Sequence, residues 1–142
     1  YPSAVGAVGL ALPEHISANY PHANAGAYVY RSNGDKVTQG STNSYGDAWS
    51  TNDIIGVAID LDNNTLSFYR NNTSQGQAFT GLTDTYLPAI YADGTTLEVN
   101  FGGYTTISIS SAASDANGYG TFEYAPPSGY YALCTKNLAE YG

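Results

Sequence analysis

Alternating oxygen-bearing side chains at residues 60–65 of this 142-residue chain could do chemistry by holding a calcium ion. A calcium loop of the EF-hand kind also needs a glycine and a downstream glutamate, and neither lies at the required offset. A tight turn between two strands explains these residues more simply. The sequence therefore predicts no metal site and no cofactor.

Paired carboxylates could instead hydrolyse a glycosidic bond. The carboxylates available for this reaction are Glu14, Asp93, Glu98 and Glu123. Nothing in the sequence pairs them, and most acidic residues adjoin Gly, Asn or Ser in turn-like contexts. A carbohydrate-active enzyme is therefore only a distant alternative.

Cys134 is the only cysteine, so the chain cannot form an internal disulfide. A catalytic thiol would need a base, and the two histidines, His15 and His22, lie in an early loop. We expect Cys134 to be a small buried hydrophobic residue on a strand. The sequence predicts that the protein is not an enzyme.

The charge of the chain excludes several classes of partner. Four cationic side chains stand against twelve acidic ones, for a formal net charge of −8. Binding to nucleic acid or to an anionic membrane needs clustered Lys and Arg, which are scattered here. No apolar run approaches the roughly 20 residues that cross a bilayer. We therefore expect no nucleic-acid binding and no membrane insertion.

The spacing of apolar residues predicts an all-β fold. No segment has the helical i, i+3, i+4 spacing over more than a turn, whereas short apolar or alternating segments recur between Gly, Asn, Asp, Pro and Ser. The expected strands are 5–12, 27–31, 36–39, 54–61, 65–70, 87–91, 97–101, 121–124 and 130–135. Residues 107–118 could hold a short strand or a helical turn.

A β-hairpin is the clearest local structure. Residues 54–61 form an apolar strand, residues 62–64 supply Asp and Asn side chains that tolerate positive φ, and residues 65–70 alternate. A Tyr-Gly pair and a Trp precede Asp-Ile-Ile-Gly-Val at 53–57, and Gly-x-Ala-Phe follows at 76–79. With Tyr-Leu-Pro-Ala at 86–89 and Val-Asn-Phe-Gly at 99–102, this order strongly resembles SPRY domains.

The resemblance implies a two-sheet antiparallel β-sandwich with a concanavalin-like jelly-roll architecture, in which 54–61 is a central strand paired to 65–70. It also implies a non-catalytic recognition module that binds partners through loops at one end of the sandwich. We expect residues 1–142 to form one such domain, excerpted from a longer polypeptide.

A second resemblance concerns the end of the chain. Residues 122–138 contain Pro-Pro-x-Gly-Tyr-x-Ala-Leu-x-Thr-x-Asn-Leu, which resembles the close of SPRY modules in virion proteins of tailed bacteriophages. The resemblance implies a virion or extracellular location, in a tail fibre, spike or surface appendage. The implied partners are a host-surface protein or glycan, or neighbouring virion subunits, and a homo-oligomer is left open.

Aromatic residues are the main binding candidates, because Tyr and Trp offer rigid amphipathic rings. The candidate residues are Tyr20, His22, Tyr28, Tyr30, Arg31, Tyr45 and Trp49. Packing over the edge of the sandwich is the simpler interpretation of Trp49. Tyr28 and Tyr30 share one face of a strand, and the sequence leaves open whether that face is buried.

The beginning of the chain suggests a structural alternative. The strand pair that precedes 5–12 in SPRY modules is absent, so we expect an open sheet edge beside this apolar strand. Either a further segment of the parent polypeptide or a strand from a neighbouring copy could cover that edge. In this alternative the protein is an assembly module that polymerises or decorates a shell.

Overall fold

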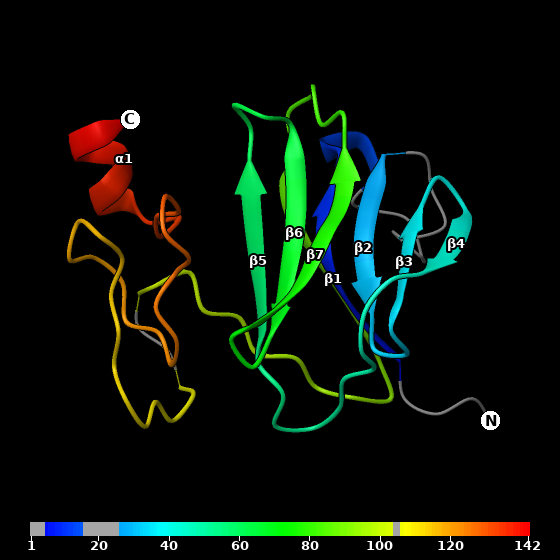
Figure 1. Ribbon diagram of the computed structural model, residues 1–142, viewed down its shortest axis with the longest axis horizontal. Coiled ribbons are helices and arrows are strands. Elements are labelled where there is room, and N and C mark those ends of the chain that lie inside the picture. The colour runs from blue at the N-terminus through cyan, green and yellow to red at the C-terminus, as the bar shows by residue number, and fades with distance from the viewer. Residues whose placement is uncertain (1–4, 16–25, 104–105) are drawn as a thin grey trace. The chain divides into compact units, whose positions relative to one another are not determined.

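In the part of the chain that the structure describes, eight strands form two antiparallel sheets (Figure 1). The computed structural model describes residues 5–15, 26–103 and 106–142. The strands are β1 (Val5–Ala11), β2 (Ala27–Arg31), β3 (Asp35–Thr38), β4 (Ser41–Ser44), β5 (Ile55–Asp60), β6 (Thr65–Arg70), β7 (Thr73–Thr80) and β8 (Leu87–Asp93). Two short helices are also present, a 3-10 turn η1 (Pro13–His15) and α1 (Thr135–Tyr141). No helix in the described ranges is long and apolar enough to cross a membrane.

The predicted hairpin is β5 paired with β6. The register places Ile55 opposite Arg70 and Asp60 opposite Thr65. Asn64 closes the turn with φ of 57°, and the Asp60 carboxylate accepts the backbone N–H of Asn63 at 2.9 Å. The side chains that suggested a calcium loop therefore hold the turn in the left-handed conformation that Asn tolerates.

The two sheets pack face to face, which confirms the predicted antiparallel β-sandwich. One sheet has the order β4-β3-β2-β1-β8 and the other β5-β6-β7. The main core takes Leu10 and Tyr30 from the first sheet and Leu66, Phe68 and Phe79 from the second. Inward residues alternate with outward ones along these strands, as the two-residue period requires.

A lysine also joins the two sheets. Lys36 on β3 donates from Nζ to the Ala78 carbonyl on β7 at 2.7 Å. The same ammonium lies 5.6 Å from the ring centroids of both Tyr45 and Phe79. Its alkyl chain and charge are thus used inside the sandwich rather than displayed to a partner.

The expected open edge beside residues 5–12 was wrong. β1 pairs with β2 on one side and with β8 on the other over its whole length, from Val5 opposite Asp93 to Ala11 opposite Leu87. A strand from later in the chain therefore supplies the neighbour that the start of the sequence lacks. Nothing at β1 calls for a donated strand.

Three other strand predictions were wrong. Residues 97–101 and 130–135 are not strands, and 121–124 contributes one isolated bridge between Ala113 and Phe122. Side chains rather than ladders hold these segments: Asn100 donates to the Thr121 carbonyl at 2.7 Å and accepts from the Gly102 N–H at 2.7 Å. Two real strands, β4 and β7, were missed because one is wholly polar and the other contains Gly76 with φ of 84°.

The chain forms two compact units, Tyr1–Leu97 and Glu98–Gly142, and all eight strands lie in the first. In the second unit, buried Asp115 accepts hydrogen bonds from the backbone N–H groups of Tyr119 and Ala132 and from the Asn137 amide. Cys134 directly precedes α1 and is half-buried, so the expectation of a buried cysteine on a strand was wrong. The prediction of one domain over residues 1–142 stays a prediction.

Truncating the centre of the core should destabilise the sandwich strongly. Phe68→Ala removes a side chain with no exposed surface, and we expect the free energy of unfolding to fall by about 3–5 kcal/mol. Urea unfolding followed by the fluorescence of the single Trp measures this change. Leu61→Ala, at a turn residue with 58% of its surface exposed, is the control, with an expected change within about 0.5 kcal/mol. Equal effects of the two variants would contradict this core.

Candidate functional site

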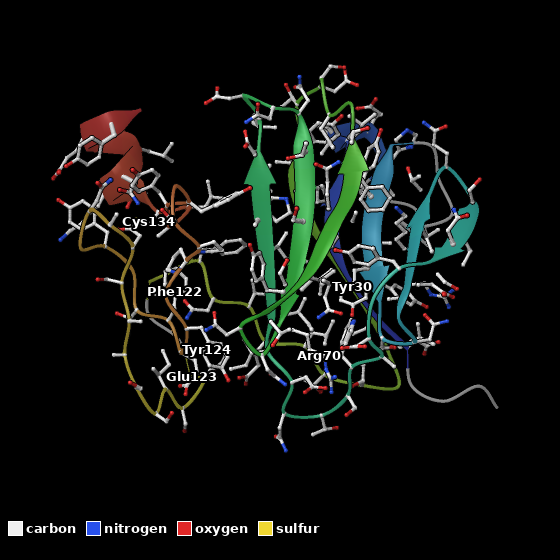
Figure 2. The ribbon with its side chains drawn as sticks, in the orientation of Figure 1. Tyr30, Arg70, Phe122, Glu123, Tyr124 and Cys134 are labelled. Carbon is white, nitrogen blue, oxygen red and sulfur yellow. The ribbon has the colours of Figure 1, made fainter. Side chains whose placement is uncertain are left out.

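Three loops meet at the end of the sandwich where β5 begins (Figure 1). They are the β2–β3 turn, the β4–β5 loop and the β6–β7 turn, with their flanking residues 31–35, 45–54 and 70–75. We call these residues the loop platform. Figure 2 shows Arg70 at this end of the sandwich, beyond Tyr30.

Backbone hydrogen bonds fasten the first loop to the second. The carbonyl of Gly34 accepts the N–H groups of Tyr45 at 3.1 Å and Gly46 at 2.9 Å, and the carbonyl of Ser32 accepts the N–H of Trp49 at 2.8 Å. Gly34 has φ of +95°, and a Cβ there would lie 2.6 Å from the Gly46 carbonyl oxygen. Only glycine lets the two loops approach this closely.

An acidic side chain fastens the second loop to the third. The Asp53 carboxylate accepts the Ser50 N–H at 2.8 Å, the Asn71 amide at 2.6 Å and the Arg70 guanidinium at 3.2–3.4 Å. Asn71 also accepts the Ile54 N–H at 2.9 Å through its side chain and donates its own N–H to the Ile54 carbonyl at 2.9 Å. The three loops are therefore one hydrogen-bonded surface.

Tyr30 supports this surface from the core side. Its ring has no exposed surface and contacts the rings of Tyr45, Phe68 and Trp49 at centroid distances of 5.2, 5.3 and 6.2 Å. Its hydroxyl donates to the backbone carbonyl of Asp47 in the second loop. Burial, followed by the negative charge of Asp47, raises the pKa of Tyr30 to about 12, so the hydroxyl remains a donor at neutral pH.

The aromatic residues proposed from the sequence lie mainly in the core. Tyr30 and Trp49 are buried in it, and Tyr28 and Tyr45 are half-buried and packed against it. Tyr28 and Tyr30 therefore face the core, which settles the question left open by the sequence. Arg31 is half-buried on the opposite face of β2. Tyr20 and His22 lie outside the described residues, and a direct partner contact for any candidate stays a prediction.

The platform residues that sequence reasoning missed are polar. Asp47, Asp53, Arg70, Asn71 and Gln75 hold the loops, but none belongs to an aromatic or catalytic pattern. The hairpin register was the available signal. Because Ile55 lies opposite Arg70, the neighbours Asp53 and Asn71 had to come close at the same end.

The side chains considered from the sequence for metal binding or catalysis lie outside the loop platform. No group of three or more His, Cys, Asp or Glu side chains there could hold a metal ion. A hollow of about 350 Å³ in the second unit is lined by Cys134, Lys136, Tyr119, Thr121, Thr135 and four glycines, with no carboxylate or histidine among its lining residues. Glu123 is held by the N–H and hydroxyl groups of Ser110.

Comparisons with known proteins match most of the chain to one family. The family model described as SPRY domain matches residues 3–104. E3 ubiquitin-protein ligase RKP of Arabidopsis thaliana is 44% identical over 66 residues, which cover 42% of this chain and 5% of that protein. ATP-dependent RNA helicase Ddx1 of Drosophila melanogaster is 29% identical over 105 residues, which cover 71% of this chain and 12% of that protein. Ran-binding protein 9 of Danio rerio is 34% identical over 67 residues, which cover 46% of this chain and 11% of that protein. The chain thus spans between 5% and 12% of the length of these relatives.

Removing the hydroxyl of Tyr30 should weaken the attachment of the platform while the packing of the core is retained. Tyr30→Phe retains the ring contacts and loses only the hydrogen bond to the Asp47 carbonyl. We expect the free energy of unfolding to fall by about 0.5–1.5 kcal/mol in urea titrations. Tyr30→Leu, which also loses the ring contacts, should cost clearly more. A Tyr30→Phe variant as damaging as Tyr30→Leu would show that the ring contacts contribute little.

Acidification should weaken the platform through Asp53. The Ser50 N–H, the Asn71 amide and the Arg70 guanidinium together lower the pKa of Asp53, although partial burial opposes them. Because the pKa is lower in the folded state, the stabilisation is present above the unfolded value of about 3.9 and is lost as pH falls through the folded value. In urea unfolding between about pH 6 and pH 2, Asp53→Asn should therefore show a smaller loss of stability on acidification than the wild type. Parallel pH profiles for the two proteins would contradict this role.

Proposed function

The chain belongs to the SPRY domain family, and from this membership we propose that it is a non-catalytic module that binds a protein partner through the loop platform. The observation that carries the proposal is the set of hydrogen bonds that Gly34, Asp53 and Tyr30 make to the platform loops, which hold the three loops together. A surface that is ordered before binding loses little conformational entropy when a partner docks. We propose no reaction.

A protein partner fits the platform better than a glycan does. Binding a sugar ring by stacking needs an exposed aromatic face, and the candidate rings of Tyr28, Tyr30, Tyr45 and Trp49 are packed in or against the core. The exposed platform side chains at 50–52 and 71–74 are instead short and carry hydroxyl or amide groups. Such groups suit hydrogen bonding to the main chain and side chains of a protein. Among the relatives, Ran-binding protein 9 is named for binding another protein.

The setting that we propose is the surface of a bacteriophage virion, in a tail fibre, spike or appendage. Two features support this setting: the resemblance of residues 122–138 to the close of phage SPRY modules, and a composition with 14 tyrosines, 16 glycines and few charged residues. The partner would then be a host-surface protein or a neighbouring virion subunit. The strand-donation alternative has lost its basis, because both edges of β1 are paired.

A bulky charged side chain on the platform should block the partner. Ser50→Arg changes an exposed residue of the β4–β5 loop and should reduce binding about tenfold or more, as expected when an interface core is obstructed. The matched control is Thr83→Arg, at an exposed residue of the loop after β7, at the opposite end of the sandwich. Labelled protein is incubated with a panel of bacterial strains, with and without protease treatment of the cells.

We expect binding to at least one strain, loss of that binding after protease treatment, and a selective effect of Ser50→Arg. Equal effects of the two variants would show that the platform is not the contact surface. Binding that survives protease but is lost after periodate oxidation would indicate a glycan. Absence of binding to every strain would contradict a host-surface partner.

A further inference from the structure

Asp47 is held in place by its backbone while its side chain remains available. Its N–H donates to the Oε1 of Gln75 on β7 at 2.7 Å, and its carbonyl accepts the hydroxyl of Tyr30 on β2. These two bonds fix the residue to both sheets without using the carboxylate. The carboxylate is therefore presented from a rigid position at the rim of the platform.

The Asp47 carboxylate is exposed and weakly paired. Its side chain has 71% of its surface accessible, and the ion pair recorded for it in the described structure is with Arg70 Nη1, at 3.9 Å. Arg70 lies closer to Asp53, with three contacts of 3.2–3.4 Å. Asp35, the remaining platform carboxylate, accepts the amide of Asn33 at 2.8 Å. Asp47 thus has the most available negative charge on the platform.

The surroundings favour a positive charge at this position. Residues 1–97 contain eight acidic side chains and three basic ones. Of the basic side chains, Lys36 is used between the sheets, Arg70 is held by Asp53, and Arg31 is half-buried. The exposed neighbours of Asp47 at 48 and 50–52 are uncharged. A surface of this sign attracts cationic groups and repels anionic ones as a partner approaches.

We propose that Asp47 receives an arginine or lysine side chain of the protein partner, and that it determines the specificity of the platform for a basic docking segment. Arginine fits best, because its planar guanidinium can bind both carboxylate oxygens at once. The inference rests on the proposed function, since it assumes that the platform is the docking surface. It adds the chemistry of the group that docks there.

The experiment selects short random peptides from a displayed library on the immobilised wild-type protein. The selected peptides are then measured against Asp47→Asn and against Asp62→Asn. The first variant removes the charge but leaves the backbone bonds of Asp47, and the second removes another exposed charge, from the β5–β6 turn at the other end of β5. Urea unfolding confirms that both variants fold.

We expect the selected peptides to be enriched in Arg or Lys and to bind Asp47→Asn about tenfold or more weakly, with affinity for Asp62→Asn within about twofold of wild type. Added salt should slow association with the wild type more than with Asp47→Asn.

Three outcomes would overturn the inference. Peptides without basic residues that depend on Ser50 but not on Asp47 would leave the proposed function standing and remove the inference alone. Basic peptides that are affected equally by both Asp→Asn variants would show a general charge effect rather than a specific site. Peptides that are insensitive to Ser50→Arg as well as to Asp47→Asn would contradict both the platform and the inference.

Discussion

Tyr30 is the side chain on which the rest of the structure depends. Its ring belongs to β2, fills the space against Phe68 of the opposite sheet, and supports Tyr45 and Trp49 at the start of the long β4–β5 loop. Its hydroxyl continues this contact to the backbone of Asp47. One residue therefore couples packing between the sheets to the position of the candidate binding surface. Because the ring is wholly buried in the close-packed core, it holds the adjacent loops in a fixed position.

Rigidity and charge together give the platform a defined role. Backbone bonds to Gly34 and hydrogen bonds to the carboxylate of Asp53 fasten the backbones of the loops to one another. The aromatic rings that make this arrangement possible are turned inward, which leaves a polar surface whose most available charge is Asp47. This division between buried aromatic support and an exposed polar surface suits the proposed recognition of a protein partner.

The sequence predicted the architecture better than the site. The all-β fold and the hairpin of β5 and β6 followed from apolar periodicity and turn residues, because those patterns depend on local geometry. The two-sheet sandwich followed from the resemblance to SPRY domains. Pairing between distant segments was beyond reach, so the closure of β1 by β8 was missed. Among the aromatic candidates, Tyr30 and Trp49 are buried next to the platform, and direct contact of any candidate with a partner stays a prediction. The register of the hairpin could have placed Asp53 beside Asn71, but the contacts of Asp47 with Tyr30 and Gln75 depend on three-dimensional proximity that no spacing rule reveals.

The central claim is that the platform is ordered before any partner binds, and amide hydrogen exchange tests it most directly. The N–H groups of Gly46 and Trp49 donate to carbonyls of the β2–β3 turn, and that of Asn71 donates to Ile54. Measured by NMR on the free protein, these three amides should exchange nearly as slowly as the amide of buried Phe68. Exchange as fast as that of exposed Thr83 would show that the loops open independently of the core, and would contradict a preformed docking surface.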